Sequence, residues 1–568
     1  MPVQFVSPTT GALEALDADD DEEAAHRFRV VDNLLYDDDD LVADGDLLLA
    51  ADAEPSTFDE AAGHEEWKRA MSEELKSIND NKTWMLTDAP PGVKPIGLKW
   101  VFKIKRDADG NITRHKARLV AKGYVQRAGV DFDEVFAPVA RMESVRFLLA
   151  IAAHYGWTVH HLDVKSAFLN GDLAEEVYVE QPPGHAIRGK ERKVYRLHKA
   201  LYGLRQAPRA WNAKLDSSLR SLGFRCSEAE HAVYVRGSGG NLLLVGVYVD
   251  DLVVVGADPM EVDRFKKEMA RLFSMSDLGS LHYYLGIEVR QGAKGITLCQ
   301  GAYADKIIEK AGLTGCNPCS TPMEPRLKLS KTSSNPPVDK TLYRSVVGSL
   351  RYLVHTRPDI AFAVGYVSRF MEAPTTEHWS AVKHLLRYIA GTRSYGCVYR
   401  RGEGALELIG FSDADHAGDS DDRKSTSGVF FFLGQNPVSW QSQKQRVVAL
   451  SSCEAEYIAG ATAACQGVWL SRLLADLVNA KVIAPLLYID NKSALALAKN
   501  PVLHERSKHI DVRFHFIRDC ISSGVIETDY IRTGDQLADL LTKPLPRERL
   551  LELRGRSGVV KISPAQQN

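Results

Sequence analysis

The sequence predicts an α+β chain in which antiparallel strands come first, a helix-rich region follows and an α/β unit comes last. The first observation is a series of short, β-prone apolar runs bounded by turn residues between residues 84 and 300. The second is a change of pattern near residue 403, after which three strand-like segments, a long helical segment, a strand and a helix succeed one another. The chain length allows about three or four domains.

The charge of the chain is unevenly distributed. Residues 1–66 hold 20 Asp or Glu and two Arg, a balance of −18, whereas the other 502 residues hold 69 Lys or Arg and 54 Asp or Glu, a balance of +15. The acidic segment, placed at residues 1–60, is therefore predicted to be disordered. A basic remainder suits a polyanionic partner.

Several features favour an intracellular protein without a membrane partner. No apolar run reaches the roughly 20 residues of a membrane span, and the N-terminus lacks the basic-then-apolar order of a secretion signal. The eight cysteines are scattered, which suggests reduced thiols.

Ordered structure is expected to begin near residue 61 with a helix. The segment EEWKRAMSEELKSI places apolar residues at helical spacing, namely Trp67, Met71, Leu75 and Ile78. Two strands joined by a turn at 109–111 follow in LKWVFKIKRDADGNITRHKARLVAKGY. The many Lys and Arg of this ribbon either cover solvated strand faces or form a basic flap over a phosphate-bearing ligand.

Two adjacent aspartates interrupt the apolar run VYVDDLVVVG. An unpaired ionised carboxylate in an apolar core costs several kcal/mol, so Asp250 and Asp251 are predicted at the tip of a hairpin between two strands. An ordinary turn would explain this pair alone, because Asp is common in turns. A functional site requires a third acidic group.

The third carboxylate is Asp163 in VHHLDVKSAFLNGDL, at the carboxyl edge of a short β-prone run. Three converging carboxylates repel one another unless a divalent cation neutralises them, and Mg²⁺ suits such oxygen ligands. Two ions about 3.5–4 Å apart clamp the attacking and leaving oxygens in polymerases and nucleases. The acids therefore predict a two-metal site.

Five segments, in order, resemble the reverse transcriptases of copia-type LTR retrotransposons: WVFKIKRDADGNITRHKARLVAKGY, LDVKSAFLNGDL, LYGLRQAPRAW, YVDDL and LGIEV. The resemblance implies a fingers-palm polymerase domain with an antiparallel palm sheet over residues 61–300. It implies that Asp163, Asp250 and Asp251 bind two Mg²⁺ ions, with the backbone of Val164 as a further ligand and Mn²⁺ as an alternative metal.

The resemblance also implies nucleotide contacts. Phe168 is expected beneath the sugar of the incoming nucleotide, where its ring would collide with a 2′-hydroxyl and select deoxynucleotides; a place in the core is the alternative. Arg118 and Lys122 are expected at the triphosphate, and Gln206 near the nucleotide.

Primer and template contacts are implied in the same way. Gly203 and Pro208 match the segment that backs the templating base pair. Leu285 and Gly286, in LGIEV, match the turn that grips the primer.

A second acidic constellation follows residue 403. LELIGFSDAD places Asp413 at a strand end, PLLYID ends at Asp490, and GDQLADLLTK reads as a helix that carries Asp539. Between them SSCEAEYIAGATAACQGVWLSRLL reads as a helix capped by Ser451 or Ser452. The order of three strands, helix, strand and helix resembles ribonuclease H, whose four acids bind two Mg²⁺ ions.

On this resemblance Asp413, Glu456, Asp490 and Asp539 are the metal ligands of a ribonuclease H domain at residues 403–548. Glu456 is chosen because EYIA fits the family's E-x-x-A pattern, and Glu454 is the alternative. Asp415 is an extra acid that an exposed surface position would also explain. YIRTGDQLAD lacks the histidine that many relatives carry near the last acid, which leaves open how product release is assisted.

The remaining boundaries follow from composition and resemblance. Residues 301–402, with YRSVVGSLRYLVHTRPDIAFAVGYVSRFM, are expected to form a helical thumb and connection region that either follows a duplex or only packs. KLSKTSSNPPVDK reads as a flexible linker, and residues 549–568 as a C-terminal tail.

The predicted function is an RNA-directed and DNA-directed DNA polymerase that also degrades RNA in RNA–DNA hybrids. Its expected partners are an RNA template, a DNA or tRNA primer, the RNA–DNA hybrid, deoxynucleoside triphosphates and other polyprotein products such as integrase and capsid. We expect it in cytoplasmic virus-like particles, with the nucleus as a further location. The alternative is an inactive transposon remnant that binds nucleic acid or has a structural role.

Overall fold

The computed structural model describes residues 54–106, 112–479, 481–500 and 510–562. The chain divides into two units, residues 1–137 with 166–215 and residues 138–165 with 216–568. Most of the predicted acidic segment and the predicted turn at 109–111 lie outside the described residues.

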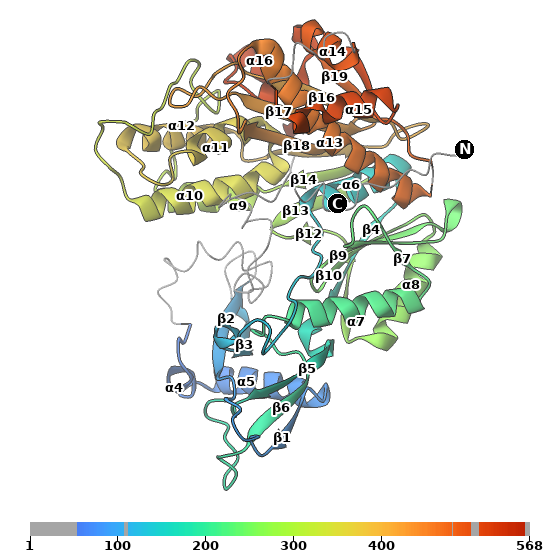
Figure 1. Cartoon of the computed structure of the whole chain (residues 1–568). Helices are drawn as coiled ribbons and strands as arrows, with labels where there is room; N and C mark the ends of the chain where they lie inside the picture. Colours follow the sequence, from blue (N-terminus) through green and yellow to red (C-terminus); the bar gives the residue numbers. More distant parts are fainter. Residues whose placement is uncertain (1–53, 107–111, 480, 501–509, 563–568) are drawn as a thin grey trace. The chain divides into compact units, whose positions relative to one another are not determined.

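The first unit contains an antiparallel ribbon, a small sheet and short helices (Figure 1). The ribbon pairs β2 with β3, as predicted, and the sheet has the order β1-β6-β5. The elements are α4 (Phe58–Ala61), α5 (Glu65–Asp80), β1 (Trp84–Thr87), β2 (Leu98–Arg106), β3 (Ile112–Ala121), η3 (Gly123–Val125), η4 (Ala167–Asn170), β5 (Asp172–Val179) and β6 (Val194–Lys199).

Helix α5 has the predicted apolar face. Trp67, Met71 and Ile78 are buried, and the helix packs against β3. The Trp67 ring meets that of Phe102, on β2, edge-on with the ring centroids 5.2 Å apart. Because such aromatic pairs add to the gain from burial, they help to hold the helix against the ribbon.

The second unit begins with a six-stranded antiparallel sheet of order β11-β4-β10-β9-β8-β7. Its strands are β4 (Val159–Val164), β7 (Arg225–Cys226), β8 (Val233–Arg236), β9 (Leu243–Tyr248), β10 (Asp251–Gly256) and β11 (Met275–Ser280). The accompanying helices are α6 (Met142–Tyr155), α7 (Ala207–Ser221), which continues from the first unit, η5 (Gly239–Asn241) and α8 (Pro259–Leu272). Strands β9 and β10 are almost entirely buried, in agreement with the predicted apolar strands around the aspartate pair.

Helix α6 lies between two layers of this unit. It packs on β9 and β10 on one side and on β14, β15 and β18 of the two following sheets on the other. Its Arg146 is 1% exposed and donates hydrogen bonds of 3.0 Å to the carbonyls of Val438 and His355. The guanidinium also lies 3.8 Å from the ring centroid of Trp440. These contacts fasten α6 to the segment before η7 and to the sheet that carries Asp413.

A five-stranded sheet brings together distant parts of the sequence in the order β12-β13-β14-β15-β21. Its strands are β12 (Tyr283–Tyr284), β13 (Ile287–Gly292), β14 (Gly295–Cys299), β15 (Tyr395–Arg400) and β21 (Val559–Lys561). The residues expected to form only a C-terminal tail thus include most of α16 (Arg547–Arg556) and strand β21, which pairs with β15. A strand of three residues is too short to show a period in the sequence.

Residues 301–402 contain the predicted helices. They comprise α9 (Gly301–Lys310), α10 (Lys340–Leu353), η6 (Val354–Thr356), η7 (Pro358–Ile360), α11 (Ala361–Ser368) and α12 (Thr376–Thr392). The prediction of a flexible linker at 328–340 is wrong. The Leu329 N–H donates to the Tyr366 hydroxyl at 3.1 Å and the Lys331 N–H to the Asp421 carboxylate at 2.8 Å, so side chains from other segments fix this extended stretch.

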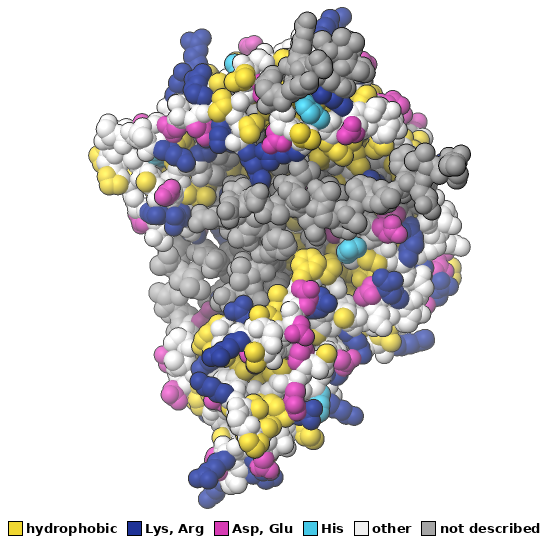
Figure 2. All heavy atoms as spheres, viewed as in Figure 1, with side chains coloured by type: hydrophobic (Ala, Val, Ile, Leu, Met, Phe, Trp, Pro, Cys, Tyr) yellow, Lys and Arg dark blue, Asp and Glu magenta, His cyan; other side chains and the backbone are white. Residues whose placement is uncertain are grey.

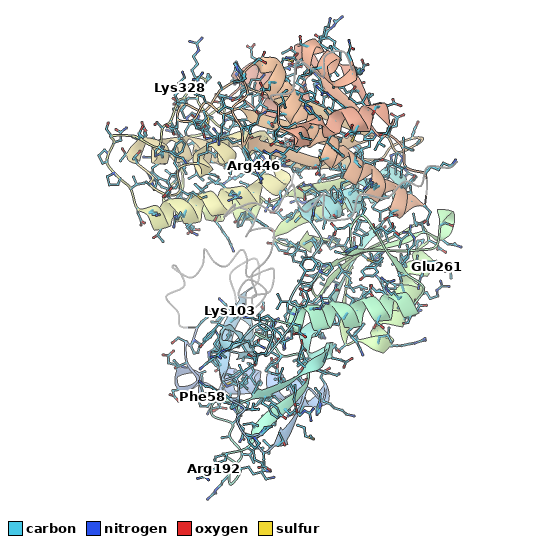
Figure 3. All side chains as sticks on the ribbon, in the orientation of Figure 1. Phe58, Lys103, Arg192, Glu261, Lys328 and Arg446 are labelled. Atoms are coloured by element: carbon cyan, nitrogen blue, oxygen red, sulfur yellow. The ribbon has the colours of Figure 1, made fainter. Side chains whose placement is uncertain are left out.

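The last sheet has the order β18-β17-β16-β19-β20, with antiparallel pairing from β18 to β16 and parallel pairing from β16 to β20 (Figure 1). Its elements are β16 (Leu408–Ala414), β17 (Thr426–Leu433), β18 (Asn436–Lys444), α13 (Ser452–Val478), β19 (Leu486–Ile489), α14 (Lys492–Lys499), η9 (Val512–His515), α15 (Phe516–Ser522), β20 (Glu527–Tyr530), η10 (Thr533–Asp535) and η11 (Leu537–Leu541). Arg446, labelled in Figure 3, lies in the segment between β18 and α13. The strand order agrees with the predicted succession of three strands, a long helix and a further strand.

Two details of this sheet differ from the prediction. Strand β20 was not predicted, and Asp539 lies on the short 3-10 helix η11 instead of an α-helix. Ser451 is the N-cap of α13 and accepts a hydrogen bond from the Glu454 N–H, as one of the two predicted caps.

The predicted α+β fold class, with antiparallel sheets followed by a mixed sheet, is confirmed. The described part of the chain has no helix that combines the length and the apolar character of a membrane span. All eight cysteines lie in the described residues as free thiols.

Candidate active sites

The first acidic site lies where β4 meets the β9–β10 hairpin. Asp163 and Asp251 are direct partners on the adjacent antiparallel strands β4 and β10. Side chains at such positions lie on the same face of a sheet. Asp250 is in the two-residue turn before β10, and its carbonyl accepts a 3.0 Å hydrogen bond from the Val164 N–H. The backbone therefore brings the three predicted aspartates to one edge of the palm sheet.

The turn itself has a constrained backbone. Val249 has a φ of 56°, which is rare for a β-branched residue. Conformations of this kind cost of order 1–3 kcal/mol and persist where the surroundings impose them. Here the well-paired strands β9 and β10 fix the two ends of the turn.

The carboxylate of Asp251 is held by a histidine that the sequence analysis did not single out. His161 Nε2 lies 2.6 Å from Asp251 Oδ1, and both side chains are mostly buried. His161 is two residues before Asp163 on β4, so it points to the same face. A His two positions before the acid in VHHLDV was the available signal.

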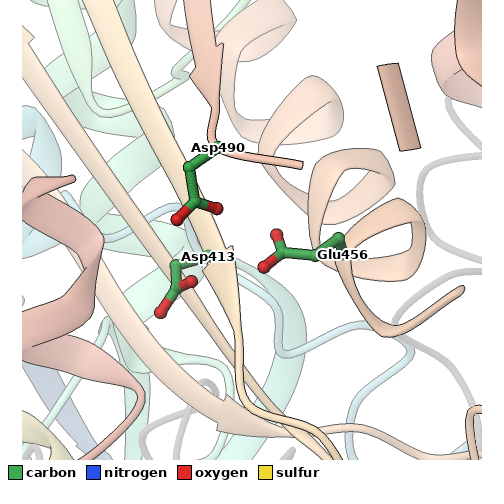
Figure 4. Close-up of side chains that lie close together, drawn as sticks. All are labelled: Asp413, Glu456 and Asp490. Atoms are coloured by element: carbon green, nitrogen blue, oxygen red, sulfur yellow. The ribbon is translucent and has the colours of Figure 1, made fainter. Parts of the chain in front are cut away.

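The second acidic site is more compact. Asp413 on β16, Glu456 on α13 and Asp490 directly after β19 point toward one another (Figure 4). Each of the three offers a ligand atom within 4.8 Å of the others. Among the described residues no other group of three metal-ligating side chains meets this spacing, and the three palm aspartates do not.

Glu454, the alternative metal ligand, has a structural hydrogen bond instead. The Glu454 carboxylate accepts a 2.9 Å hydrogen bond from the Leu450 N–H, just before α13 begins. Glu456 instead faces Asp413 and Asp490, and one of its oxygens is buried without a hydrogen-bond partner. The geometry thus favours Glu456 over Glu454 as the ligand.

Burial and mutual repulsion shape the electrostatics of this cluster. Burial, then the nearby carboxylates of Asp413 and Asp490, raises the pKa of Glu456 to about 10. Burial also raises the pKa of Asp490, with a smaller contribution from Asp539. Burial and mutual repulsion disfavour the ionised form of these acids, and a bound cation would relieve both effects.

Asp539 lies outside the compact group of three acids and is paired with basic side chains. Lys543 Nζ lies 2.6 Å from Asp539 Oδ1 and 3.5 Å from Asp413 Oδ2, and Arg549 lies 3.5 Å from Asp539 Oδ2. The Thr542 hydroxyl donates to Asp413 Oδ2. Lys543 and Arg549 were not among the predicted site residues. The position of Lys543, four residues after Asp539, was a signal for the first of them.

The 3-10 helix η11 reaches the site because of two features of neighbouring strands. Gln536 donates a 2.9 Å hydrogen bond to the Ser412 carbonyl on β16. Gly428, opposite Asp413 on β17, leaves room for η11, since a Cβ there would lie 2.7 Å from Thr542 Cγ2 and 2.9 Å from the Ala538 carbonyl. Any larger residue at 428 would push Asp539 away from the other acids.

The extra acid Asp415 is partly buried. Burial raises its pKa to about 6, and it accepts a hydrogen bond from the Thr426 N–H. It therefore fixes the start of β17 against the end of β16, beside Asp413.

Comparisons with known proteins identify the family. A family model described as Reverse transcriptase (RNA-dependent DNA polymerase) matches residues 81–325. The chain is 42% identical over 518 residues to the Retrovirus-related Pol polyprotein from transposon RE1 of Arabidopsis thaliana, which covers 91% of this chain and 35% of the relative. It is 37% identical over 300 residues to a transposon Ty5-1 protein of Saccharomyces cerevisiae, which covers 52% of this chain and 97% of that relative.

The chain belongs to the Pol polyproteins of copia-type retrotransposons. It spans little more than a third of the length of the long Pol polyproteins that it matches. The chain is similar to a solved structure of the foamy viral protease-reverse transcriptase in complex with RNA/DNA hybrid, with a TM-score of 0.46 and 12% identity. The match covers 82% of this chain and 54% of that one.

In this copia-type Pol chain, the residues expected at the nucleotide lie in the first unit. Phe168 is 3% exposed, and its ring lies 5.0 Å from that of Tyr202. The Arg118 guanidinium lies 4.5 Å from the Tyr202 ring centroid. Lys122 is half-buried, and its N–H donates to the Gly97 carbonyl. Phe168 and Arg118 thus share contacts with one tyrosine.

Gln206, expected near the nucleotide, and the expected template residues Gly203 and Pro208 of the same copia-type chain are buried. Gln206 is 2% exposed and donates to the Asp131 carbonyl at 3.1 Å while accepting from Gln126. Gly203 has a φ of 89°, and a Cβ there would lie 2.2 Å from the Ala121 carbonyl. Pro208 is buried at the start of α7. These residues hold the segment against β3, and the structure gives the amide of Gln206 a packing role.

Leu285 and Gly286, the expected primer-gripping turn of this copia-type chain, join β12 to β13. Their φ angles of 48° and 73° are both positive, as in the two-residue hairpin turns that match the twist of strands.

Proposed function

We propose that this chain is an RNA-directed DNA polymerase, which also copies DNA, joined to a nuclease that cuts the RNA of RNA–DNA hybrids. The observation that carries the proposal is the pairing of Asp163 with Asp251 beside the Asp250 turn, in a chain whose residues 81–325 match a reverse transcriptase family model. The compact Asp413, Glu456 and Asp490 cluster supports the nuclease half.

The strand register places Asp163 and Asp251 side by side, where the charge of divalent cations would draw the polymerase carboxylates together. Asp163, Asp250 and Asp251, with the backbone carbonyl of Val164, would hold Mg²⁺. When bound, the two ions supply charge that activates the primer 3′-hydroxyl and stabilises the leaving pyrophosphate. The protein's part is positioning, because β4 and β10 are fixed in register and His161 holds one oxygen of Asp251.

The nuclease acids fit in the same way. A buried Glu456 oxygen without a hydrogen-bond partner, facing two further carboxylates, is a donor set that suits a hard cation. Asp413, Glu456 and Asp490 would hold one Mg²⁺, and Asp539 would complete a second position. The sheet and α13 keep these acids fixed while water attacks an RNA phosphodiester.

The proposed substrates are an RNA or DNA template, a DNA or tRNA primer, deoxynucleoside triphosphates and the RNA–DNA hybrid. Lys and Arg side chains occur on both units on the face shown in Figure 2, interspersed with acidic ones. Residues 67–568 carry the excess of positive charge found in the sequence. Phosphate contacts would supply most of the affinity, so binding should fall steeply with salt.

Two assays on the purified chain test the proposal. With Mg²⁺ and deoxynucleotides, the unmodified protein should extend a primer on an RNA template and cut RNA in a hybrid. Asp250→Asn should abolish extension and leave hybrid cleavage intact, and Asp413→Asn should do the reverse. If the unmodified protein neither extends a primer nor cuts a hybrid, the alternative of an inactive nucleic-acid-binding remnant replaces this proposal.

A further inference from the structure

A lysine ammonium lies among the acids of the proposed nuclease site. Lys543 Nζ is 2.6 Å from Asp539 Oδ1 and 3.5 Å from Asp413 Oδ2. The side chain is therefore a fixed positive charge that bridges two of the four acids.

The four acids are not equivalent in this arrangement. Asp413, Glu456 and Asp490 form the compact group, whereas Asp539 lies outside it. One oxygen of Asp539 is paired with Lys543 and the other lies 3.5 Å from Arg549. A divalent ion held by both Asp539 and Asp413 would compete with the Lys543 ammonium for these two carboxylates.

We propose that the Lys543 ammonium occupies a cation position between Asp413 and Asp539, so that a second divalent ion binds there only by displacing it. Lys543 thereby sets the affinity of the second ion, and affects less the ion held by Asp413, Glu456 and Asp490. This inference rests on the proposed nuclease function and deepens it by naming the residue that controls loading of the second metal.

The physical argument is competition between cations for the same oxygens. Like charges a few ångströms apart repel strongly where water is partly excluded, so the ammonium and a divalent ion exclude one another. Lysine suits the exchange, because its flexible stem lets the charge leave without disturbing the backbone. The Lys543 side chain is 39% exposed, which gives it a way out to solvent.

Divalent ion binding tests the proposal directly. The full chain carrying Asp250→Asn, to remove ion binding at the palm, is titrated with Mn²⁺, and free Mn²⁺ is followed by electron paramagnetic resonance. Lys543→Met should tighten the weaker site by at least about tenfold and change the affinity of the tighter site by less than that. Lys444→Met is the matched control, because Lys444, at the end of β18, forms ion pairs of 2.7 and 2.8 Å with Asp419 and Asp422 in the segment between β16 and β17 and, within the described part of the chain, forms no ion pair with the four acids. Equal or weaker binding of Mn²⁺ by Lys543→Met overturns the proposal.

A second measurement uses the unsubstituted lysine and does not depend on a variant folding. Acetylation of Lys543 in the wild-type chain is followed by mass spectrometry, with Lys444 as the internal reference. Saturating Mg²⁺ should increase acetylation of Lys543 several-fold relative to Lys444, because the ammonium loses its ion pairs. Unchanged or lower acetylation contradicts displacement.

The two proposals fail in different ways. If Asp413→Asn abolishes hybrid cleavage in the wild-type background but Lys543→Met leaves Mn²⁺ binding unchanged, only the role of Lys543 is lost. If the chain binds no Mn²⁺ at these acids at all, both the nuclease function and this inference are wrong.

Discussion

Asp359→Asn should destabilise the second unit far more than a surface substitution would. Arg357 and Asp359 form a bidentate ion pair with both N–O distances 2.8 Å, and their side chains are 1% and 0% exposed. Asp359 also accepts a 2.7 Å hydrogen bond from Tyr388 on α12, and the Tyr388 hydroxyl accepts one from Arg554 on α16. The pair therefore ties η7, α12 and α16 together in the core.

The magnitude follows from leaving a buried guanidinium without its charge partner. Breaking a buried ion pair on one side costs about 3–5 kcal/mol, because the remaining charge is uncompensated. The matched control is Asp305→Asn. Its partner Arg393 lies 3.3 Å away, but both side chains are more than half exposed. The substitution should therefore lower the free energy of unfolding by about 1 kcal/mol or less.

The dependence on pH has a definite sign. Burial opposes ionisation of Asp359, but Arg357 outweighs it and holds the pKa of Asp359 below its ordinary value. A depressed carboxyl pKa contributes stability that is present above the unfolded pKa, about 3.9, and is lost as the pH falls through the folded pKa. The difference in the free energy of unfolding between wild type and Asp359→Asn should thus have its full size at pH 7 and decrease only below about pH 4.

Hydrogen exchange of α12 amides under native conditions, followed by mass spectrometry, measures the opening free energy of this region at each pH. A loss of less than about 1 kcal/mol at pH 7 in Asp359→Asn, or a loss equal to that of Asp305→Asn, would refute the account of the buried pair.

Two further substitutions probe the proposed sites. Glu456→Gln should lower hybrid cleavage by at least about 100-fold, whereas Glu454→Gln, whose amide oxygen can still accept from the Leu450 N–H, should retain most of it; equal losses would remove the distinction between the two glutamates. Phe168→Ala should increase incorporation of ribonucleotides relative to deoxynucleotides by about tenfold or more in a primer-extension assay, and unchanged sugar discrimination would leave Phe168 only its core contact with Tyr202.

The sequence predicted the parts of the fold that depend on local pattern. The β9–β10 hairpin, the helix from Glu65 to Asp80 and the N-cap at Ser451 are all visible as apolar periods or cap residues. Strand β20 and the sheet that joins β14 to β15 and β21 depend on contacts between distant segments, which a short apolar run does not specify.

The sites show the same limit. Most of the acids stand at strand ends, whereas Glu456 and Asp539 lie in helical segments, and all of them could be proposed from the sequence. Their partners could not, because His161 acts on Asp251 across two strands and Arg549 reaches Asp539 from the following helix. The expected flexible linker failed for a related reason, since its hydrogen bonds come from Tyr366 and Asp421, in segments far along the chain.

Metal-directed backbone cleavage tests the central claim most directly. Fe²⁺ replaces Mg²⁺ in the full chain, and ascorbate with peroxide cuts the backbone beside each bound ion, after which the fragments are identified by mass spectrometry. The account predicts two separate groups of cuts, one near Asp163 and Asp250 and one near Asp413 and Asp490, each removed by an Asp→Asn change in its own group alone. Cuts that are absent from either group, or that survive these changes, would contradict the presence of two acidic metal sites.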